Sequence, residues 1–115
     1  MTKVYVAGPI SDNDPIKIFK NEKNGIDTAA WLILRGFSVF CPHIDFLYLL
    51  GNHGKQITKA MLQRNSMAFV ADCDCMLVLP GWEDSPGTRQ EMAEAGRLNI
   101  PIYFDAKELA EAEVL

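Results

Sequence analysis

The chain has 115 residues, of which 49% are hydrophobic and 23% are charged, and its formal net charge at pH 7 is −4. A chain of this size is expected to form one domain, residues 1–115, with a sizeable core. The negative charge argues against duplex nucleic acid or an anionic membrane as a partner, and no apolar run reaches the ~20 residues of a membrane span. Three cysteines and a beginning without the layout of a signal peptide predict reduced thiols in a cytoplasmic protein.

Strand and helix signals alternate along the chain. Strands are expected at 3–8, 37–41, 75–79 and 100–104, and helices at 16–34, 57–71, 88–98 and 106–113. In the first helix, apolar residues from Ile16 to Ile33 recur close to helical spacing, with Asp14 as its cap and Gly36 just past its end. The segment 42–55 is expected to be a loop that carries an apolar cluster and both histidines.

Strands separated by helices of this length predict right-handed crossovers and a mainly parallel sheet. The expected fold class is α/β, a small doubly wound sheet of about four or five strands, flavodoxin-like or Rossmann-like, with helices on both faces. Its ligand site should lie beyond the carboxyl ends of the strands, where the loops after Gly8 and Cys41 meet the turn 81–88. Neither GxGxxG nor GxxxxGK[ST] is present, which disfavours ordinary dinucleotide or P-loop binding.

The most informative stretch is GWEDSPGTRQEMAEAG, residues 81–96, which follows the third strand. Ser85 is a cap candidate and Pro86 stands in the first helical turn. The free N–H groups of such a helix start attract anions such as phosphate. Glu91 follows about one turn into the helix, where a carboxylate is a candidate catalytic group. The alternative is an ordinary cap followed by a solvated acidic turn.

Together with KVYVAGPI at residues 3–10, this motif resembles the nucleoside 2-deoxyribosyltransferase superfamily, over Lys3 to about Phe104. That superfamily includes the 2'-deoxynucleoside 5'-monophosphate N-glycosidases and an uncharacterised branch common in phages and bacteria, which the chain resembles most. The resemblance implies that Glu91 is the nucleophile and that Tyr5 positions it. It also implies that Ser85 holds a 5'-phosphate, where nucleoside-using relatives carry an aspartate. No cofactor and no metal is expected.

The resemblance and the helix start predict a substrate-binding set from both motifs. Its members are Gly8, Pro9, Ile10, Trp82, Ser85, Gly87, Thr88 and Arg89. Two of them have alternative roles: Trp82 stacks on a base or covers the edge of the sheet, and Arg89 binds phosphate or pairs with nearby acids and solvent.

One departure from the superfamily concerns the acid that handles the departing base. Its position falls at Ser66, which has no carboxylate. Asp84 joins Glu91 and Tyr5 in the predicted catalytic set as its substitute, with Asp45 and Glu83 as alternatives.

The predicted function is hydrolytic or transfer cleavage of the N-glycosidic bond of a (deoxy)nucleoside 5'-monophosphate through a glutamate nucleophile. The alternative is a non-catalytic nucleotide sensor or sponge that uses the same pocket. The apolar cluster at 46–50 and the resemblance both predict a homodimer or larger homo-oligomer.

Overall fold

The computed structural model describes residues 2–113, and within this range one sheet contains four parallel strands in the order β2-β1-β3-β4. The strands are β1 (Lys3–Ala7), β2 (Ser38–Phe40), β3 (Cys75–Val78) and β4 (Ile102–Tyr103). The chain moves from β1 outward to β2 and then crosses to the other side of β1 to form β3. This reversal confirms the doubly wound α/β class and creates a switch point between β1 and β3, where such sheets bind ligands.

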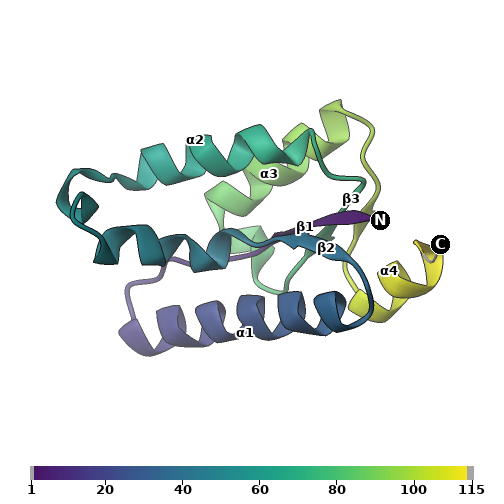
Figure 1. Cartoon of the computed structure of the whole chain (residues 1–115), viewed down its shortest axis with the longest axis horizontal. Helices are drawn as coiled ribbons and strands as arrows, with labels where there is room; N and C mark the ends of the chain where they lie inside the picture. Colours follow the sequence, from purple (N-terminus) through teal and green to yellow (C-terminus); the bar gives the residue numbers. More distant parts are fainter. Residues whose placement is uncertain (1, 114–115) are drawn as a thin grey trace.

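Helices cover both faces of the sheet. The helices are α1 (Pro15–Leu34), α2 (Lys59–Val70), α3 (Pro86–Arg97) and α4 (Ala106–Ala112). Figure 1 shows α1 and α4 below the sheet and α2 and α3 above it. Because side chains alternate along a strand, β1 feeds two cores: Val4 and Val6 pack with Leu32 of α1, whereas Tyr5 packs with the side of α2 and α3.

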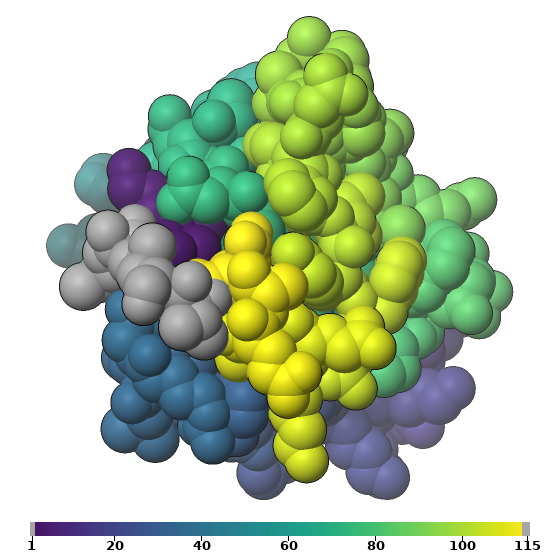
Figure 2. All heavy atoms as spheres, turned by 90° about the vertical axis from the view of Figure 1, so that its right-hand side faces the viewer, coloured from purple at the N-terminus to yellow at the C-terminus, as the bar shows by residue number. Residues whose placement is uncertain are grey.

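The amino and carboxyl ends of the strands lie at opposite ends of the molecule. Figure 2 shows the end at which β1 begins, with α4 beside it. The carboxyl ends of the parallel strands therefore lie at the opposite end of the molecule, where the loops that follow them must meet. No helix of the described part is both long and apolar enough to cross a membrane.

Local caps fix where the helices begin. The Asp14 carboxylate accepts the backbone N–H of Ile16 at 2.9 Å, and the Thr58 hydroxyl caps α2. The predicted start of α2 at 57 is therefore wrong by two residues, because Thr58 is the cap and Lys59 the first helical residue. α3 begins at Pro86, before the predicted 88, since proline is already compatible with the first helical position.

The prediction of a loop at 42–55 is wrong. Pro42–Leu50 forms a 3-10 helix, η1, and Gly54–Gln56 forms a second one, η2. The 3-10 helix has three residues per turn, so a continuous apolar run carries no signal for it at the 3.6 or 2.0 period. η1 leaves β2, contacts α1 and runs between α1 and α2 (Figure 1). A third 3-10 turn, η3 (Trp82–Asp84), lies between β3 and α3.

The first helix is confirmed, but its apolar repeat does not mark its buried face. Ile16, Phe19 and Ile33 are all exposed. The buried residues of α1 are Gly25, Ala29 and Leu32. The small residues let the helix approach its neighbours closely, and this placement decides which polar residues of α1 point inward.

Candidate active site

A cavity of about 870 Å³ lies at the carboxyl end of the sheet. It is bounded by the loop after β1, by α1, η1 and α2, and by the turn from η3 into α3. Six residues of the predicted site line it: Gly8, Ile10, Asp84, Ser85, Gly87 and Glu91. Segments far apart in the sequence therefore converge where the switch point predicts a ligand site.

Glu91 and Tyr5 form the buried centre of this site. Glu91 is only 5% exposed, and the hydroxyl of the fully buried Tyr5 donates a hydrogen bond to its Oε2. Burial raises the pKa of Glu91 to about 7, while the Tyr5 hydrogen bond opposes this rise. Burial and then the Glu91 charge raise the pKa of Tyr5 far above its usual range, so Tyr5 stays a protonated donor that orients Glu91.

A second carboxyl group, Asp45, is tied to the same centre through Ser66. The buried Ser66 hydroxyl donates to Asp45 Oδ2 at 3.0 Å. Ser66 also lowers the pKa of Tyr5, so the Ser66–Asp45 pair lies beside the Tyr5–Glu91 pair, and the two pairs join residues of four elements. Burial raises the pKa of Asp45, and the Ser66 bond lowers it. The position expected to carry an acid thus holds a hydroxyl that orients a different acid.

The three alternatives for the missing acid occupy different environments. Asp45 is buried and lines the cavity. Asp84 also lines it but is exposed on η3, and Glu83 is exposed and does not line it. Burial favours the protonated form of a carboxyl group, and of these three residues only Asp45 is buried, which favours Asp45 over the other two.

The start of α3 has the geometry of an anion site. The Ser85 hydroxyl accepts the Thr88 backbone N–H at 3.3 Å and the Thr88 hydroxyl at 2.8 Å. Because Ser85 is the acceptor in both bonds, its own hydrogen remains for another acceptor. Gln63 of α2 braces this turn by donating to the Gly87 carbonyl at 3.2 Å. A Cβ at Gly87 would lie 3.2 Å from the Gln63 amide oxygen, so glycine suits this close approach.

His43 supports the loop after β1 through a hydrogen bond to its backbone. Its Nε2 donates to the Pro9 carbonyl at 3.3 Å, since a carbonyl only accepts, and its Nδ1 lies 3.5 Å from Cys41 Sγ. The ring packs on Gly25 so closely that a Cβ there would lie 2.3 Å from it. Burial lowers the pKa of His43 to about 4, so this ring is neutral near pH 7 and serves as a structural support.

Four residues of the predicted substrate-binding set do not line the cavity. They are Pro9, Trp82, Thr88 and Arg89. Trp82 packs against Phe104 with ring centroids 5.8 Å apart, which favours its alternative role of covering the β4 edge of the sheet. Thr88 is buried as part of the helix cap, and Arg89 is exposed. Thr88 and Arg89 of α3 fail to reach the cavity because successive residues of a helix point in different directions.

Several residues that line the cavity were not predicted as site residues. They are Glu22 of α1, Lys59, Gln63 and Arg64 of α2, and Gln90 of α3. Lys59 and Arg64 bring positive charge to the side of the cavity formed by α2, in a lining that also contains four acidic residues. Across residues 2–113, no group of three or more histidine, cysteine or acidic side chains is arranged to hold a metal ion.

This architecture defines an α/β protein of the deoxyribosyltransferase-like fold. The structure is similar to that of a 2-deoxyribosyltransferase from the psychrotolerant bacterium Bacillus psychrosaccharolyticus, with a TM-score of 0.58 and 17% sequence identity, over 88% of this chain and 69% of that one. No curated protein has a significantly similar sequence. A family model described as "Domain of unknown function (DUF4406)" matches residues 2–104, and the chain belongs to this family.

Proposed function

We propose that this protein cleaves the N-glycosidic bond of a deoxynucleoside 5'-monophosphate, with Glu91 as the nucleophile. One observation carries the proposal: the Glu91 carboxyl group is buried, receives the Tyr5 hydrogen bond and lines a cavity that also contains the start of α3. A carboxylate held at a fixed place beside an anion site is the arrangement that glycosidic cleavage requires. The similarity in fold to a deoxyribosyltransferase supports the same chemistry.

The proposed substrate has its phosphate at the start of α3. Ser85 has a hydroxyl hydrogen to donate, the Gly87 backbone N–H lies in the first turn of α3, and Lys59 and Arg64 add positive charge. The sugar then lies over Glu91, and the base extends toward η1, where Phe46 and Leu49 give the cavity an apolar wall. This assignment favours the monophosphate N-glycosidase branch of the superfamily.

The proposed reaction has two steps. Glu91 attacks the anomeric carbon as the bond to the base breaks, through an oxocarbenium-like transition state. Water then releases deoxyribose 5-phosphate, or a second base accepts the sugar in a transfer reaction. Three free cysteines agree with a reducing compartment, and we place the activity in the cytoplasm.

The experiment is a panel of nucleoside and deoxynucleoside 5'-monophosphates, assayed for free base by chromatography. We expect base release by the unmodified protein and a fall of at least ~10³-fold in Glu91→Gln, because the amide keeps the shape but not the attacking charge. Monophosphate binding, measured by calorimetry, should survive in Glu91→Gln. Glu94→Gln is the matched control, because Glu94 lies on the same helix outside the cavity.

A nucleotide sensor or sponge without turnover is the second candidate, and Ser66 favours it because a hydroxyl is no acid. This candidate predicts that the unmodified protein binds a monophosphate but releases no base from any member of the panel over hours. Base release that persists undiminished in Glu91→Gln would contradict Glu91 as the nucleophile.

A further inference from the structure

Glycosidic cleavage needs a proton donor at the departing base as well as a nucleophile, and the superfamily's acid is replaced by Ser66. We propose that Glu22 of α1 is the leaving-group acid of this site. The proposal rests on the proposed function, and it names a residue that no motif in the sequence singles out.

Glu22 is placed in the cavity by the buried face of α1. It precedes Gly25, Ala29 and Leu32 by three, seven and ten residues, so all four lie on the same side of the helix. Its side chain lines the cavity together with Asp45 and Glu91. Its Oε2 is buried and has no hydrogen-bond partner in the described part of the chain. A buried carboxyl oxygen without a partner is costly, and a ligand in the cavity would supply the partner.

Hydrogen bonding decides which cavity carboxyl group holds a proton. Tyr5 donates to Glu91 and Ser66 donates to Asp45, and each of these bonds stabilises the charged form of its acceptor. The Glu22 Oε2 receives no such donor. The proton therefore belongs on Glu22, and the pattern of donors separates an acid from two carboxylates. Consistent with this assignment, burial first and the Asp45 charge second raise the pKa of Glu22 to about 7.

The other titratable and charged groups around the cavity are poor donors for this step. They are Tyr5 on β1, His43 and Asp45 on η1, Lys59 and Arg64 on α2, Asp84 on η3 and Glu91 on α3. His43 is neutral and its Nε2 hydrogen is engaged with the Pro9 carbonyl. Tyr5 is committed to Glu91, and Lys59, Arg64 and Asp84 are exposed.

The step balances as follows. A Glu91 oxygen forms a bond to the anomeric carbon while the carbon–nitrogen bond breaks. The electron pair of the breaking bond goes to the base nitrogen. The Glu22 carboxyl proton transfers to the departing base, which leaves Glu22 as a carboxylate. In the second step a water oxygen bonds to the anomeric carbon and the ester bond to Glu91 breaks. Glu22 takes the proton of that water and is restored.

The test compares substrates that do and do not need this proton. The ordinary substrate is the best deoxynucleoside 5'-monophosphate from the panel. The activated substrate carries N7-methylguanine or a 4-nitrophenoxy group on the same sugar phosphate, whichever the unmodified protein cleaves. These groups need no proton to depart, because they leave as neutral N7-methylguanine or as 4-nitrophenolate. Glu22→Gln should lose about 100-fold or more on the ordinary substrate and less than about 5-fold on the activated one. Asp27→Asn is the control, since Asp27 is exposed on α1 and paired with Lys23 at 2.5 Å.

A pH profile on the ordinary substrate gives a second readout. Glu91 must be charged and Glu22 protonated for the reaction. The rate should therefore rise with pH up to about 7, as Glu91 ionises, and fall above it, as Glu22 loses its proton. In Glu22→Gln the residual rate should keep the rising limb and lose the falling one. Retained monophosphate binding by calorimetry shows that the variant is folded.

Each outcome decides the inference. Selective loss on the ordinary substrate supports it. Equal loss on both substrates, or an unchanged falling limb, overturns Glu22 as the acid and leaves the proposed function standing. An unmodified protein that cleaves only the activated substrate has no working acid. This result also overturns the inference but leaves Glu91 as the proposed nucleophile. If the unmodified protein cleaves neither substrate, the proposed function fails and Glu22 loses its role with it.

Discussion

At the scale of single residues, the properties of the site depend on which hydroxyl group donates a hydrogen bond to which acceptor. Tyr5, Ser66 and Ser85 each hold a hydrogen whose destination sets the charge of a neighbour or the affinity for a ligand. Two carboxyl groups in the same cavity, Glu22 and Glu91, have pKa values raised to about 7 by burial. Small changes in these hydrogen bonds should therefore change the pH range in which the protein works.

Tyr5→Phe should shift the pH dependence of base release. The variant removes the hydrogen bond that lowers the pKa of Glu91, so that pKa rises and Glu91 is more protonated at pH 7. We expect kcat/KM at pH 7 to fall about 10- to 100-fold and to recover partly toward pH 8.5, which a pH series measures. Tyr103→Phe, on β4 and outside the cavity, is the control. A rising limb that stays in place would contradict the role of Tyr5.

Ser85→Asp should weaken monophosphate binding. A carboxylate at the start of α3 would repel a phosphate where the hydroxyl would donate to it, and we expect a loss of about 1–3 kcal/mol by calorimetry. Ser85→Ala, which removes the hydroxyl without adding charge, should lose less. Equal affinity of the unmodified protein for a nucleoside and its monophosphate would remove the phosphate site from the proposal.

At the scale of elements, Gly25 of α1 and Gly96 of α3 are packed differently. α1 approaches η1 so closely that Gly25 touches the His43 ring, whereas Gly96 on α3 has no atom within 4 Å of where a Cβ would be. The close contact holds η1 and the loop after β1 in place, and both segments line the cavity. The same residue type is thus required in one helix and replaceable in the other.

Gly25→Ala and Gly96→Ala should change stability in opposite directions. The Gly25 variant must displace the buried His43 ring and should cost about 1–3 kcal/mol. The Gly96 variant gains helix propensity without a clash and should stabilise the protein by up to ~1 kcal/mol. Chemical denaturation measures both free energies of unfolding. A Gly25 variant as stable as the unmodified protein would show that η1 can move away from α1.

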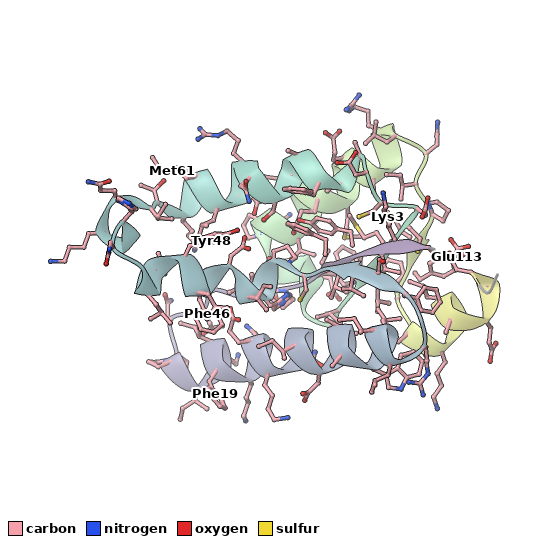
Figure 3. The ribbon with its side chains drawn as sticks, viewed as in Figure 1. Lys3, Phe19, Phe46, Tyr48, Met61 and Glu113 are labelled. Atoms are coloured by element: carbon pink, nitrogen blue, oxygen red, sulfur yellow. The ribbon has the colours of Figure 1, made fainter. Side chains whose placement is uncertain are left out.

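At the scale of the whole molecule, apolar side chains gather at the end that carries the cavity. This apolar end surface consists of exposed residues of α1 and η1: Ile16, Phe19, Phe46, Leu47, Tyr48, Leu49 and Leu50. Figure 3 shows Phe46 on the side of η1 toward α1, Tyr48 on the side toward α2, and Phe19 on the outer side of α1. We propose that this surface is an interface with a second copy of the chain, which would cover the cavity.

The apolar end surface predicts a homodimer or larger homo-oligomer in solution. Light scattering after size exclusion should give a mass of at least twice that of the chain. Leu47→Glu combined with Leu50→Glu should produce a monomer, because both side chains lie on this surface and neither lines the cavity. Leu34→Glu, which changes a still more exposed leucine at the other end of α1, should leave the mass unchanged. A monomeric unmodified protein would contradict the prediction.

The sequence by itself determined the features that depend on neighbours in the chain. Alternating strands and helices gave the parallel sheet, the caps Asp14 and Ser85 placed two helix starts, and one short motif contained Ser85 and Glu91. Each of these signals is local, because strand period, helix period and capping act over a few residues.

Only the tertiary structure decided how the site is completed. The 3-10 form of η1, the buried face of α1 and the Ser66–Asp45 bond all depend on contacts between distant segments. Glu22 had one faint signal, an acidic residue on the same helical face as Gly25 and Ala29, but the exposed apolar residues of α1 pointed to another face. The physical reason is that a helix buries whichever face its neighbours contact closely, and the sequence of one helix does not specify those neighbours.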